Sequence, residues 1–285
     1  MRVLVTGVMG QLGHDVVRHL SEHGIEHKGV DREDFDLGDA EAVMRAVQDY
    51  CPTVIVHCAA YTAVDRAESD MEACFRVNAQ GTANMVRAAL SVDAALVYIS
   101  TDYVFGGEGE EAFETEDAKN PKNIYGLSKF QGELAVCHQM TKYFIVRTSW
   151  VYGVHGNNFV KTMLRLGSSR PQVNVVCDQI GSPTYSWDLA ALVCRMIRTK
   201  KYGIYHATNE EFCSWAEFAA AIMEKAHLNC RVNPIPTSEY PTPAHRPCNS
   251  RLSKKSLDAA GFSRLPSWED ALDRYLRELS LEGMI

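Results

Sequence analysis

The first two dozen residues constrain the fold more than any other part of this 285-residue chain. An apolar, β-rich run at 2–6 leads directly into Gly7, Gly10 and Gly13, and a helical pattern follows at 11–23. This order of strand, glycine turn and helix is typical of dinucleotide-binding units, although the spacing is Gly-x-x-Gly-x-x-Gly. Gly7 would allow a tight turn, Gly10 the close approach of a pyrophosphate, and Gly13 the packing of helix on strand. A glycine-rich turn without a nucleotide is the alternative.

The end of the second predicted strand bears on the choice of cofactor. The stretch 27–31 ends in Asp31, eighteen residues after Gly13, where a carboxylate can accept a hydrogen bond from the adenosine ribose. Asp31 therefore favours NADH. Arg32 follows directly and could instead meet the 2′-phosphate of NADPH, so the sequence leaves the choice between the two cofactors open.

Strand-like and helical segments alternate over the first half of the chain. This alternation predicts an α/β fold with a doubly wound, parallel Rossmann sheet, in which ligands bind at the carboxyl ends of the strands. The segments 59–62 and 100–102 follow two such ends, so several motifs converge on one crevice. Asp36 and Leu37, after a strand-like stretch at Phe35, could touch the adenine. The predicted strands are 2–6, 27–31, 53–60, 95–100 and 143–149, and the predicted helices are 11–23, 39–50, 72–90 and 122–138.

Tyr125 and Lys129 form a Tyr-x-x-x-Lys pair within the predicted helix 122–138. Residues four apart share a helix face, so the Lys129 ammonium could lower the pKa of the Tyr125 phenol towards neutrality. A tyrosine tuned in this way can act as an acid–base catalyst, and Thr101 would supply a hydroxyl to the same substrate oxygen. The pattern alone is weak, but the dinucleotide motif upstream makes it informative.

Composition argues against several classes of protein. The formal charge of −7 and the lack of a basic stripe argue against nucleic-acid binding. None of the nine cysteines forms a Cys-x-x-Cys motif, as expected for reduced thiols. No apolar run is long enough to span a bilayer, and the first residues enter a strand without room for a signal peptide. We therefore expect a cytoplasmic protein that contacts neither nucleic acid nor membrane.

Beyond residue 150 the pattern changes to short strands, further helices and a proline-rich loop. We predict a dinucleotide-binding domain at 1–150 plus about 184–202, and a smaller C-terminal α/β substrate domain at about 151–183 and 203–285. The loop could close over a substrate, because its prolines exclude a regular helix. They are Pro234, Pro236, Pro241, Pro243 and Pro247.

Longer motifs are spread over nearly the whole chain. They are 59–68 (AAYTAVDRAE), 100–105 (STDYVF), 125–129 (YGLSK), 147–152 (RTSWVY), 156–159 (GNNF), 178–184 (DQIGSPT) and 246–250 (RPCNS). With these motifs the chain resembles the extended short-chain dehydrogenase/reductases and, within them, the dTDP-4-dehydrorhamnose reductase family.

The resemblance implies roles for residues around the crevice. Those implied for the cofactor are Gly10, Gln11 and Leu12 at the pyrophosphate, Asp31 and Asp36 at the adenosine, Ala60, Tyr61 and Thr62 at its inner part, and Tyr125 and Lys129 at the nicotinamide. Those implied for the nucleotide-sugar are Thr101, Asp102 and Trp150, with Asn158 and Arg246 as weaker candidates.

The implied reaction is reduction of the C4 ketone of dTDP-4-dehydro-L-rhamnose to dTDP-L-rhamnose. Hydride would come from NADPH or NADH, and Tyr125 would give a proton to the developing alkoxide. Lys129 would also hydrogen-bond the nicotinamide ribose. Arg246 could clamp a diphosphate or form a surface salt bridge.

Two alternatives stay open. A regulatory subunit similar to that of methionine adenosyltransferase would bind the dinucleotide without catalysis, and an epimerase or dehydratase would act on a related nucleotide-sugar. The intact set of Thr101, Tyr125 and Lys129 favours the reductase, although Asp102 keeps a dehydratase open. His57 stands where the family typically has asparagine. No metal ligands are predicted; Mg²⁺ and a homodimer are both compatible with the sequence.

Overall fold

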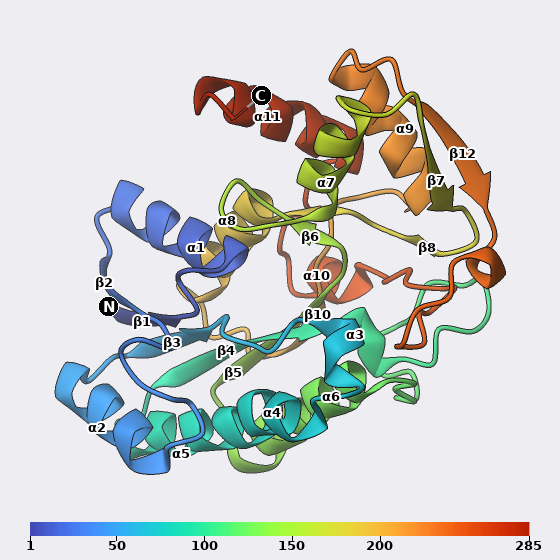
Figure 1. The fold of residues 1–285 in the computed structure, drawn as a ribbon. Coiled ribbons are helices and arrows are strands. Elements are labelled where there is room, and N and C mark those ends of the chain that lie inside the picture. The colour runs from blue at the N-terminus through green and yellow to red at the C-terminus, as the bar shows by residue number, and fades with distance from the viewer. Residues whose placement is uncertain (285) are drawn as a thin grey trace.

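A six-stranded parallel sheet forms the centre of the protein in this computed structural model, which describes residues 1–284 (Figure 1). The sheet confirms the predicted α/β Rossmann fold. From one edge to the other its strands are β10 (Gly203–His206), β5 (Tyr143–Thr148), β4 (Ala95–Thr101), β3 (Val54–His57), β1 (Arg2–Thr6) and β2 (Glu26–Val30).

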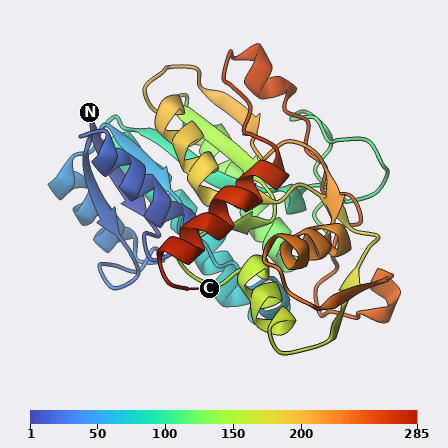
Figure 2. The same ribbon diagram turned by 90° about the horizontal axis from the view of Figure 1, so that it is seen from above.

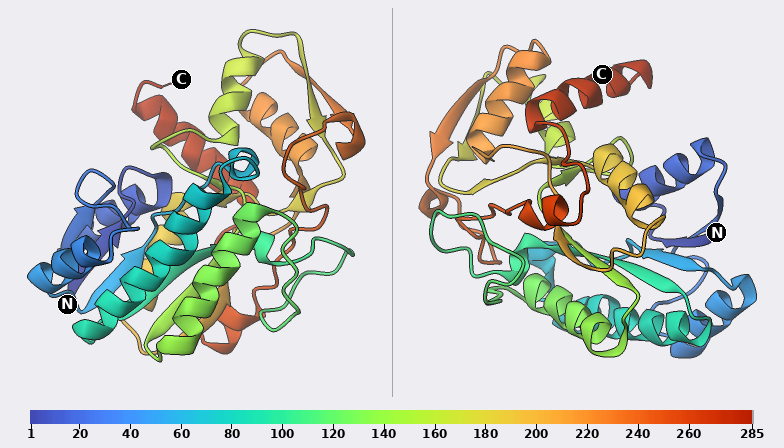
Figure 3. Two further views of the ribbon diagram at one scale, coloured as in Figure 1. Left: turned by 60° about the horizontal axis from the view of Figure 1, so that its bottom comes forward. Right: turned by 180° about the vertical axis from the view of Figure 1, so that it is seen from behind.

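Helices cover both faces of the sheet, so the fold is doubly wound (Figure 1, Figure 3). One face carries α1 (Gln11–Glu22) and α8 (Ser186–Met196), and the other carries α2 (Ala40–Tyr50), α5 (Thr82–Ser91) and α6 (Ile124–Gln139). Val3 and Val5 pack with side chains of α1 and α8, whereas Leu4 packs with side chains of α2, α5 and α6. Successive side chains of a strand point to opposite faces, so one short apolar run supplies both cores.

The strand order reverses at β1, which has β2 on one side and β3 on the other. In open α/β sheets the ligand crevice lies at the carboxyl ends of the strands at such a reversal. The segment between β2 and α2 contains no strand, so the strand-like stretch expected at Phe35 is wrong. Side chains in this segment accept hydrogen bonds from nearby backbone instead. Asp34, for example, accepts one from the Asp31 N–H at 2.7 Å, and such contacts favour turns.

A second group of elements packs around an aromatic core beside the sheet (Figure 2). Tyr152, Phe218, Trp268 and Tyr275 are all buried in this core. Its elements are β6 (Val151–Tyr152) paired with β9 (Thr184–Tyr185), β7 (Gln172–Val176) paired with β12 (Arg231–Ile235), β8 (Ile180–Gly181) paired with β11 (Cys213–Ser214), and the helices α7 (Phe159–Gly167), α9 (Trp215–Lys225) and α11 (Trp268–Leu281).

The chain returns from this group to the central sheet. Helix α8 packs on α1, as expected. Strand β10 also pairs with β5, although the sequence places residues from 203 onwards in the predicted substrate domain. Helix α10 (Lys255–Ala259) packs against β10. We therefore propose a two-domain division that keeps β10 with the dinucleotide-binding part. Across residues 1–284 no helix has both the length and the apolarity needed to cross a membrane.

A buried ion pair fixes α6 against the sheet. Glu133 on α6 and Arg147 on β5 have side chains that are 3% and 1% exposed, and two hydrogen bonds of 2.7 and 2.8 Å join them. Ser100 on β4 donates to Glu133 Oε1 at 2.6 Å, and Arg147 also donates to the Thr115 carbonyl at 2.9 Å. Bidentate geometry with additional hydrogen bonds is what allows such a pair to be buried.

Glu133→Gln should lower the free energy of unfolding by about 3–5 kcal/mol, because it leaves the Arg147 guanidinium buried without a counter-charge. Urea unfolding of the variant and the wild type measures this difference. Glu41→Gln is the matched control, since Glu41 pairs with Arg45 on the exposed surface of α2 and such pairs contribute about 0–1 kcal/mol. Equal losses for the two variants would contradict the importance given to the buried pair.

Candidate active site

The glycine turn after β1 is closed in by backbone on two sides. Gly7 has a φ of +75°, and a Cβ on it would lie 2.6 Å from the Ala59 nitrogen. A Cβ on Gly13 would lie 2.2 Å from the Gly7 carbonyl oxygen. Both positions therefore require glycine, Gly7 also because of its left-handed backbone conformation. The backbone that lies closest to Gly13 is therefore that of the glycine turn, at Gly7.

Gly10 leaves the N-terminus of α1 open to an anion. It is the N-cap residue, and no side chain caps this end of the helix. The first-turn N–H groups, at Gln11, Leu12 and Gly13, lack intrahelical acceptors and carry the positive end of the helix dipole. Such an end binds pyrophosphate readily, so the residues present fit a dinucleotide.

Asp31 ties the end of β2 to the glycine turn. Its Oδ2 accepts a hydrogen bond from the Met9 N–H at 2.9 Å, and its Oδ1 accepts one from the Arg32 N–H at 2.8 Å. The Arg32 side chain is exposed. A carboxylate and a guanidinium thus stand next to each other beside the turn, where the sequence predicts the adenosine ribose.

Asp36 and Leu37 lie in the loop before α2. Asp36 accepts a hydrogen bond from the Gly38 N–H at 2.7 Å and pairs with Arg76, and both contacts lower its pKa. Leu37 packs against Gly81 of the π-helix η1 (Arg76–Gly81), where an added Cβ would lie 2.8 Å from the Leu37 Cβ. The loop predicted to touch the adenine is therefore held by η1.

The loop after β3, which contains Ala60, Tyr61 and Thr62, is held by Asn78 of η1. The Tyr61 N–H donates to Asn78 Oδ1 at 2.8 Å, and Asn78 Nδ2 donates to the Tyr61 carbonyl at 3.1 Å and to Ser128 Oγ at 3.0 Å. Asn78 is only 1% exposed. Turns of π-helix often occur at functional sites, and this one joins the predicted cofactor loop to α6.

Thr101, Tyr125 and Lys129 come from two neighbouring elements. Thr101 ends β4, while Tyr125 and Lys129 lie in the first two turns of α6. The Thr101 hydroxyl donates to Asp102 Oδ1 at 2.9 Å, and it lowers the pKa of the Tyr125 phenol. Lys129 Nζ lies over the ring of Tyr98, 4.1 Å from its centroid. The structure therefore brings Thr101, Asp102 and Tyr125 together.

Burial dominates the protonation of Tyr125 and Lys129. It raises the pKa of Tyr125, and the Asp102 carboxylate raises this pKa further, while the Thr101 hydroxyl lowers it. Burial also lowers the pKa of Lys129 to about 7, against the opposing effect of Glu133. The expected lowering of the Tyr125 pKa by Lys129 is therefore wrong for this structure, because burial and the Asp102 carboxylate outweigh the effects that lower this pKa.

Asp102 is a buried carboxyl group with one free oxygen. The residue is 5% exposed, and burial raises its pKa to about 6. Among the atoms of residues 1–284, its Oδ2 finds no hydrogen-bond partner. The Ser250 hydroxyl lies close enough to lower the pKa of Asp102, and a donor that a ligand brings, such as a sugar hydroxyl, is a second partner that this oxygen can take.

The other substrate candidates contact protein groups. Trp150 has a φ of +50° and stacks on Trp215 with ring centroids 3.7 Å apart. Asn158 caps α7 and donates to Gln11 Oε1 at 3.0 Å, so it joins the second group of elements to the start of α1. Arg246 forms an ion pair within the protein.

Two residues beside Tyr125 are absent from the sequence-based candidates. Asn123 is the N-cap of α6 and accepts from the Gly126 N–H at 2.8 Å, a preference that could have been found in the sequence. Tyr103 packs edge-on against the Tyr125 ring, with centroids 5.8 Å apart. This contact has no sequence signal, because it depends on how the 3₁₀ turn η2 (Asp102–Val104) leaves β4.

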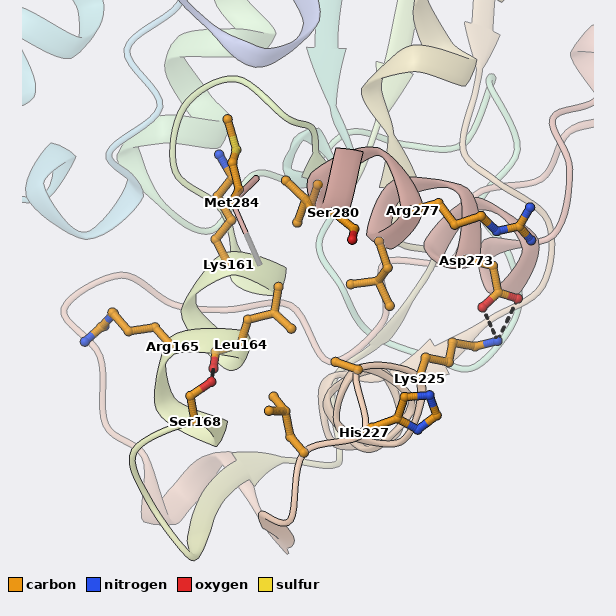
Figure 4. Close-up of a pocket in the computed structure, with 14 residues that line it drawn as sticks. Lys161, Leu164, Arg165, Ser168, Lys225, His227, Asp273, Arg277, Ser280 and Met284 are labelled. Atoms are coloured by element: carbon orange, nitrogen blue, oxygen red, sulfur yellow. Dashed lines mark hydrogen bonds and ion pairs between the residues drawn. The ribbon is translucent and has the colours of Figure 1, made fainter. Parts of the chain in front are cut away.

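A hollow of about 840 Å³ lies between α7, α9 and α11, and none of the predicted site residues lines it (Figure 4). Leu164 and Leu276 are among its apolar lining residues, and Arg165 and Arg277 are among the basic ones. It is therefore separate from the crevice at β1.

Comparisons with known proteins agree over the whole chain. A family model described as RmlD substrate binding domain matches residues 1–281. The spore coat polysaccharide biosynthesis protein SpsK of Bacillus subtilis (strain 168) is 40% identical over 279 residues, which cover 98% of each chain. The crystal structure of a dTDP-4-dehydrorhamnose reductase from Clostridium acetobutylicum ATCC 824 is 40% identical, with a TM-score of 0.96 over 98% of this chain and 100% of that one.

A further solved structure carries a cofactor. The dTDP-4-dehydrorhamnose reductase of Bacillus anthracis str. Ames, in complex with NADP, is 44% identical, with a TM-score of 0.95 over 97% of this chain and 99% of that one. The residues that the family model matches run from the glycine turn past Arg246 and so include the entire site. The chain therefore belongs to the RmlD substrate-binding-domain family, together with the dTDP-4-dehydrorhamnose reductases to which it is similar.

Proposed function

We propose that the protein reduces the C4 ketone of dTDP-4-dehydro-L-rhamnose to dTDP-L-rhamnose with NADPH or NADH. The observation that carries the proposal is the group of Thr101, Asp102 and Tyr125 at the carboxyl end of β4, in which Thr101 and Asp102 are buried and Tyr125 is partly buried. It shares the crevice with a helix N-terminus that fits a pyrophosphate. Relatives at about 40% identity that are named reductases favour this reaction over the regulatory subunit and over the epimerase or dehydratase.

Tyr125 is protonated at neutral pH, because burial raises its pKa, so the phenol can act as the proton donor. NADPH or NADH, when bound, would supply the hydride for the ketone carbon. As the ketone oxygen gains negative charge, Tyr125 gives its proton to that oxygen, and the Thr101 hydroxyl turns its hydrogen from Asp102 Oδ1 to donate a hydrogen bond to it. The free Oδ2 of Asp102 accepts from a sugar hydroxyl and so orients the ring.

Lys129 stabilises the charge that proton transfer leaves on Tyr125. With a pKa of about 7, its amine responds strongly to nearby charge, and a tyrosinate or a cofactor phosphate favours the ammonium form. The two residues are one helical turn apart on α6, which keeps them on the same face. In this mechanism Lys129 becomes fully charged when the site is loaded.

The structure offers groups for either cofactor. The Asp31 carboxylate can accept from the ribose hydroxyls of NADH, while the exposed Arg32 side chain can pair with the 2′-phosphate of NADPH. We infer that Arg32 makes NADPH the better reductant, in line with the NADP complex of the Bacillus anthracis relative. The proposal includes the cytoplasm as the compartment, which the composition leads us to expect, and a homodimer as the assembly, which is compatible with the sequence.

Tyr125→Phe should lower kcat by at least about a hundredfold, because general acid catalysis contributes about 10²–10⁴ in rate. Its affinity for NADPH should stay close to that of the wild type. The assay follows the loss of NADPH absorbance with dTDP-4-dehydro-L-rhamnose as substrate. Tyr240→Phe is the control, since Tyr240 is 57% exposed and lies outside the site. Wild-type turnover by Tyr125→Phe would refute the proposed role.

Arg32→Ala should raise the KM for NADPH about tenfold and leave the KM for NADH within about twofold, because a hydrogen bond between charged groups contributes about 1.5–3 kcal/mol. Steady-state kinetics with each cofactor measure the two constants. Arg45→Ala, which removes an exposed arginine of α2, should change neither. Equal changes for NADPH and NADH in Arg32→Ala would show that Arg32 does not meet the 2′-phosphate.

A further inference from the structure

The helix that carries Tyr125 begins in contact with the proline-rich segment, defined here as residues 241–247. Asn123, the N-cap of α6, accepts from the Gly126 N–H and donates through Nδ2 to the carbonyl of His245 at 2.9 Å. One side chain therefore both starts the helix and binds this segment. Asn123 is buried whereas His245 is exposed, so the contact is partly shielded from water.

Arg246, in the same segment, makes a second connection to the site. Its guanidinium donates to Asp65 Oδ2 at 2.6 Å and to the Tyr103 hydroxyl at 3.1 Å. Asp65 lies on the short helix α3 (Val64–Ala67) and also accepts from the Ala244 N–H at 3.3 Å. The arginine is thus fixed at both of its terminal nitrogens by protein groups, and a carboxylate balances its charge.

Tyr103 transmits the position of Arg246 to Tyr125. The two tyrosine rings meet edge to face, with centroids 5.8 Å apart and planes at 78°. The backbones are also close, because a Cβ on Gly126 would lie 2.2 Å from the Tyr103 carbonyl oxygen. A shift of Tyr103 therefore cannot occur without a shift of the first turn of α6.

A further contact joins α3 directly to α6. Glu68, which ends α3, accepts from the Ile124 N–H of α6 through Oε1 at 2.9 Å. Helix α3, the proline-rich segment and the first turn of α6 are therefore linked pairwise by hydrogen bonds. Tyr125 lies in the turn that all these contacts fix.

We propose that Arg246 is a positioning residue that holds Tyr125 in its reactive orientation through Tyr103, with Asp65 fixing the guanidinium. The proposal rests on the reductase function and on the role of Tyr125 within it. It differs from a diphosphate clamp, the other role considered for Arg246, because the contacts that carry it are those of the guanidinium with Tyr103 and Asp65. A misplaced catalytic group lowers the rate of the chemical step while leaving substrate binding largely intact.

The test compares Tyr103→Phe, Arg246→Met and the double variant in the full-length protein. Tyr103→Phe removes only the hydroxyl that Arg246 contacts and keeps the ring against Tyr125. Each single variant should lower kcat about tenfold with the KM for the sugar and for NADPH within about twofold. The double variant should be no slower than Arg246→Met alone, because the contact that Tyr103→Phe removes is already lost in Arg246→Met. The controls are Tyr240→Phe and Arg165→Met, whose exposed side chains lie outside this network.

Three kinetic outcomes decide the matter. A fall in kcat with unchanged KM and no additivity supports the positioning role. A large rise in the KM for the sugar in Arg246→Met, with Tyr103→Phe like the wild type, would mean that Arg246 contacts the substrate directly and would overturn the proposal. Variants that all behave like the controls would overturn it as well.

A second measurement does not depend on turnover. Backbone amide exchange at residues 123–127 in the NADPH-bound protein should be about tenfold faster in Arg246→Met and Tyr103→Phe than in the wild type and the controls, because local opening becomes easier. Unchanged exchange would overturn the positioning role. If the wild type did not reduce the sugar, the proposed function would fail, while the exchange rates would still test the contact of Arg246 with α6.

Discussion

The buried pair of Glu133 and Arg147 holds α6 on the sheet, and the geometry of the site depends on that contact. Glu133 is one helical turn beyond Lys129 and two beyond Tyr125, so fixing it fixes the face on which both lie. Ser100, which donates to the same carboxylate, directly precedes Thr101 on β4. One carboxylate therefore positions the proton donor on the helix and the hydroxyl on the strand relative to each other. The ion pair matters energetically because it is buried. If either partner were removed, the charge of the other would remain buried without a counter-charge and without water.

Burial also sets the chemistry of the site. It raises the pKa of Tyr125 and of Asp102 and lowers that of Lys129, so each group moves towards its neutral form. A neutral phenol is the correct starting state for donating a proton to an alkoxide. A lysine with a pKa of about 7 then gains its charge in response to negative charge nearby. Burial by itself makes a tyrosinate costly, so the charge that Lys129 gains is what offsets the negative charge formed when a ketone is reduced.

The sequence predicts those parts of the site that depend on local structure. Gly7, Gly10 and Gly13 could be placed because their spacing and the flanking strand and helix suffice, and the pair of Tyr125 and Lys129 because helical geometry relates them. The contacts of Asn158 with Gln11 and of Arg246 with Asp65 join residues 147 and 181 positions apart. No local pattern encodes such partners. The same applies to β10, whose place in the central sheet depends on how the chain returns from the second group of elements.

Those distant contacts connect the second group of elements to the crevice at two separate places. At the cofactor end, Asn158 bonds Gln11 at the start of α1 and also donates to the hydroxyl of Tyr275 in the aromatic core. At the catalytic end, the proline-rich segment bonds Asn123 and Tyr103 around the start of α6. A unit attached at both ends of a crevice cannot shift at one end without straining the other. The spacing between the pyrophosphate turn and Tyr125 is consequently set by both parts of the protein together, so the second group of elements helps to define the catalytic geometry in addition to any contacts it makes with a substrate.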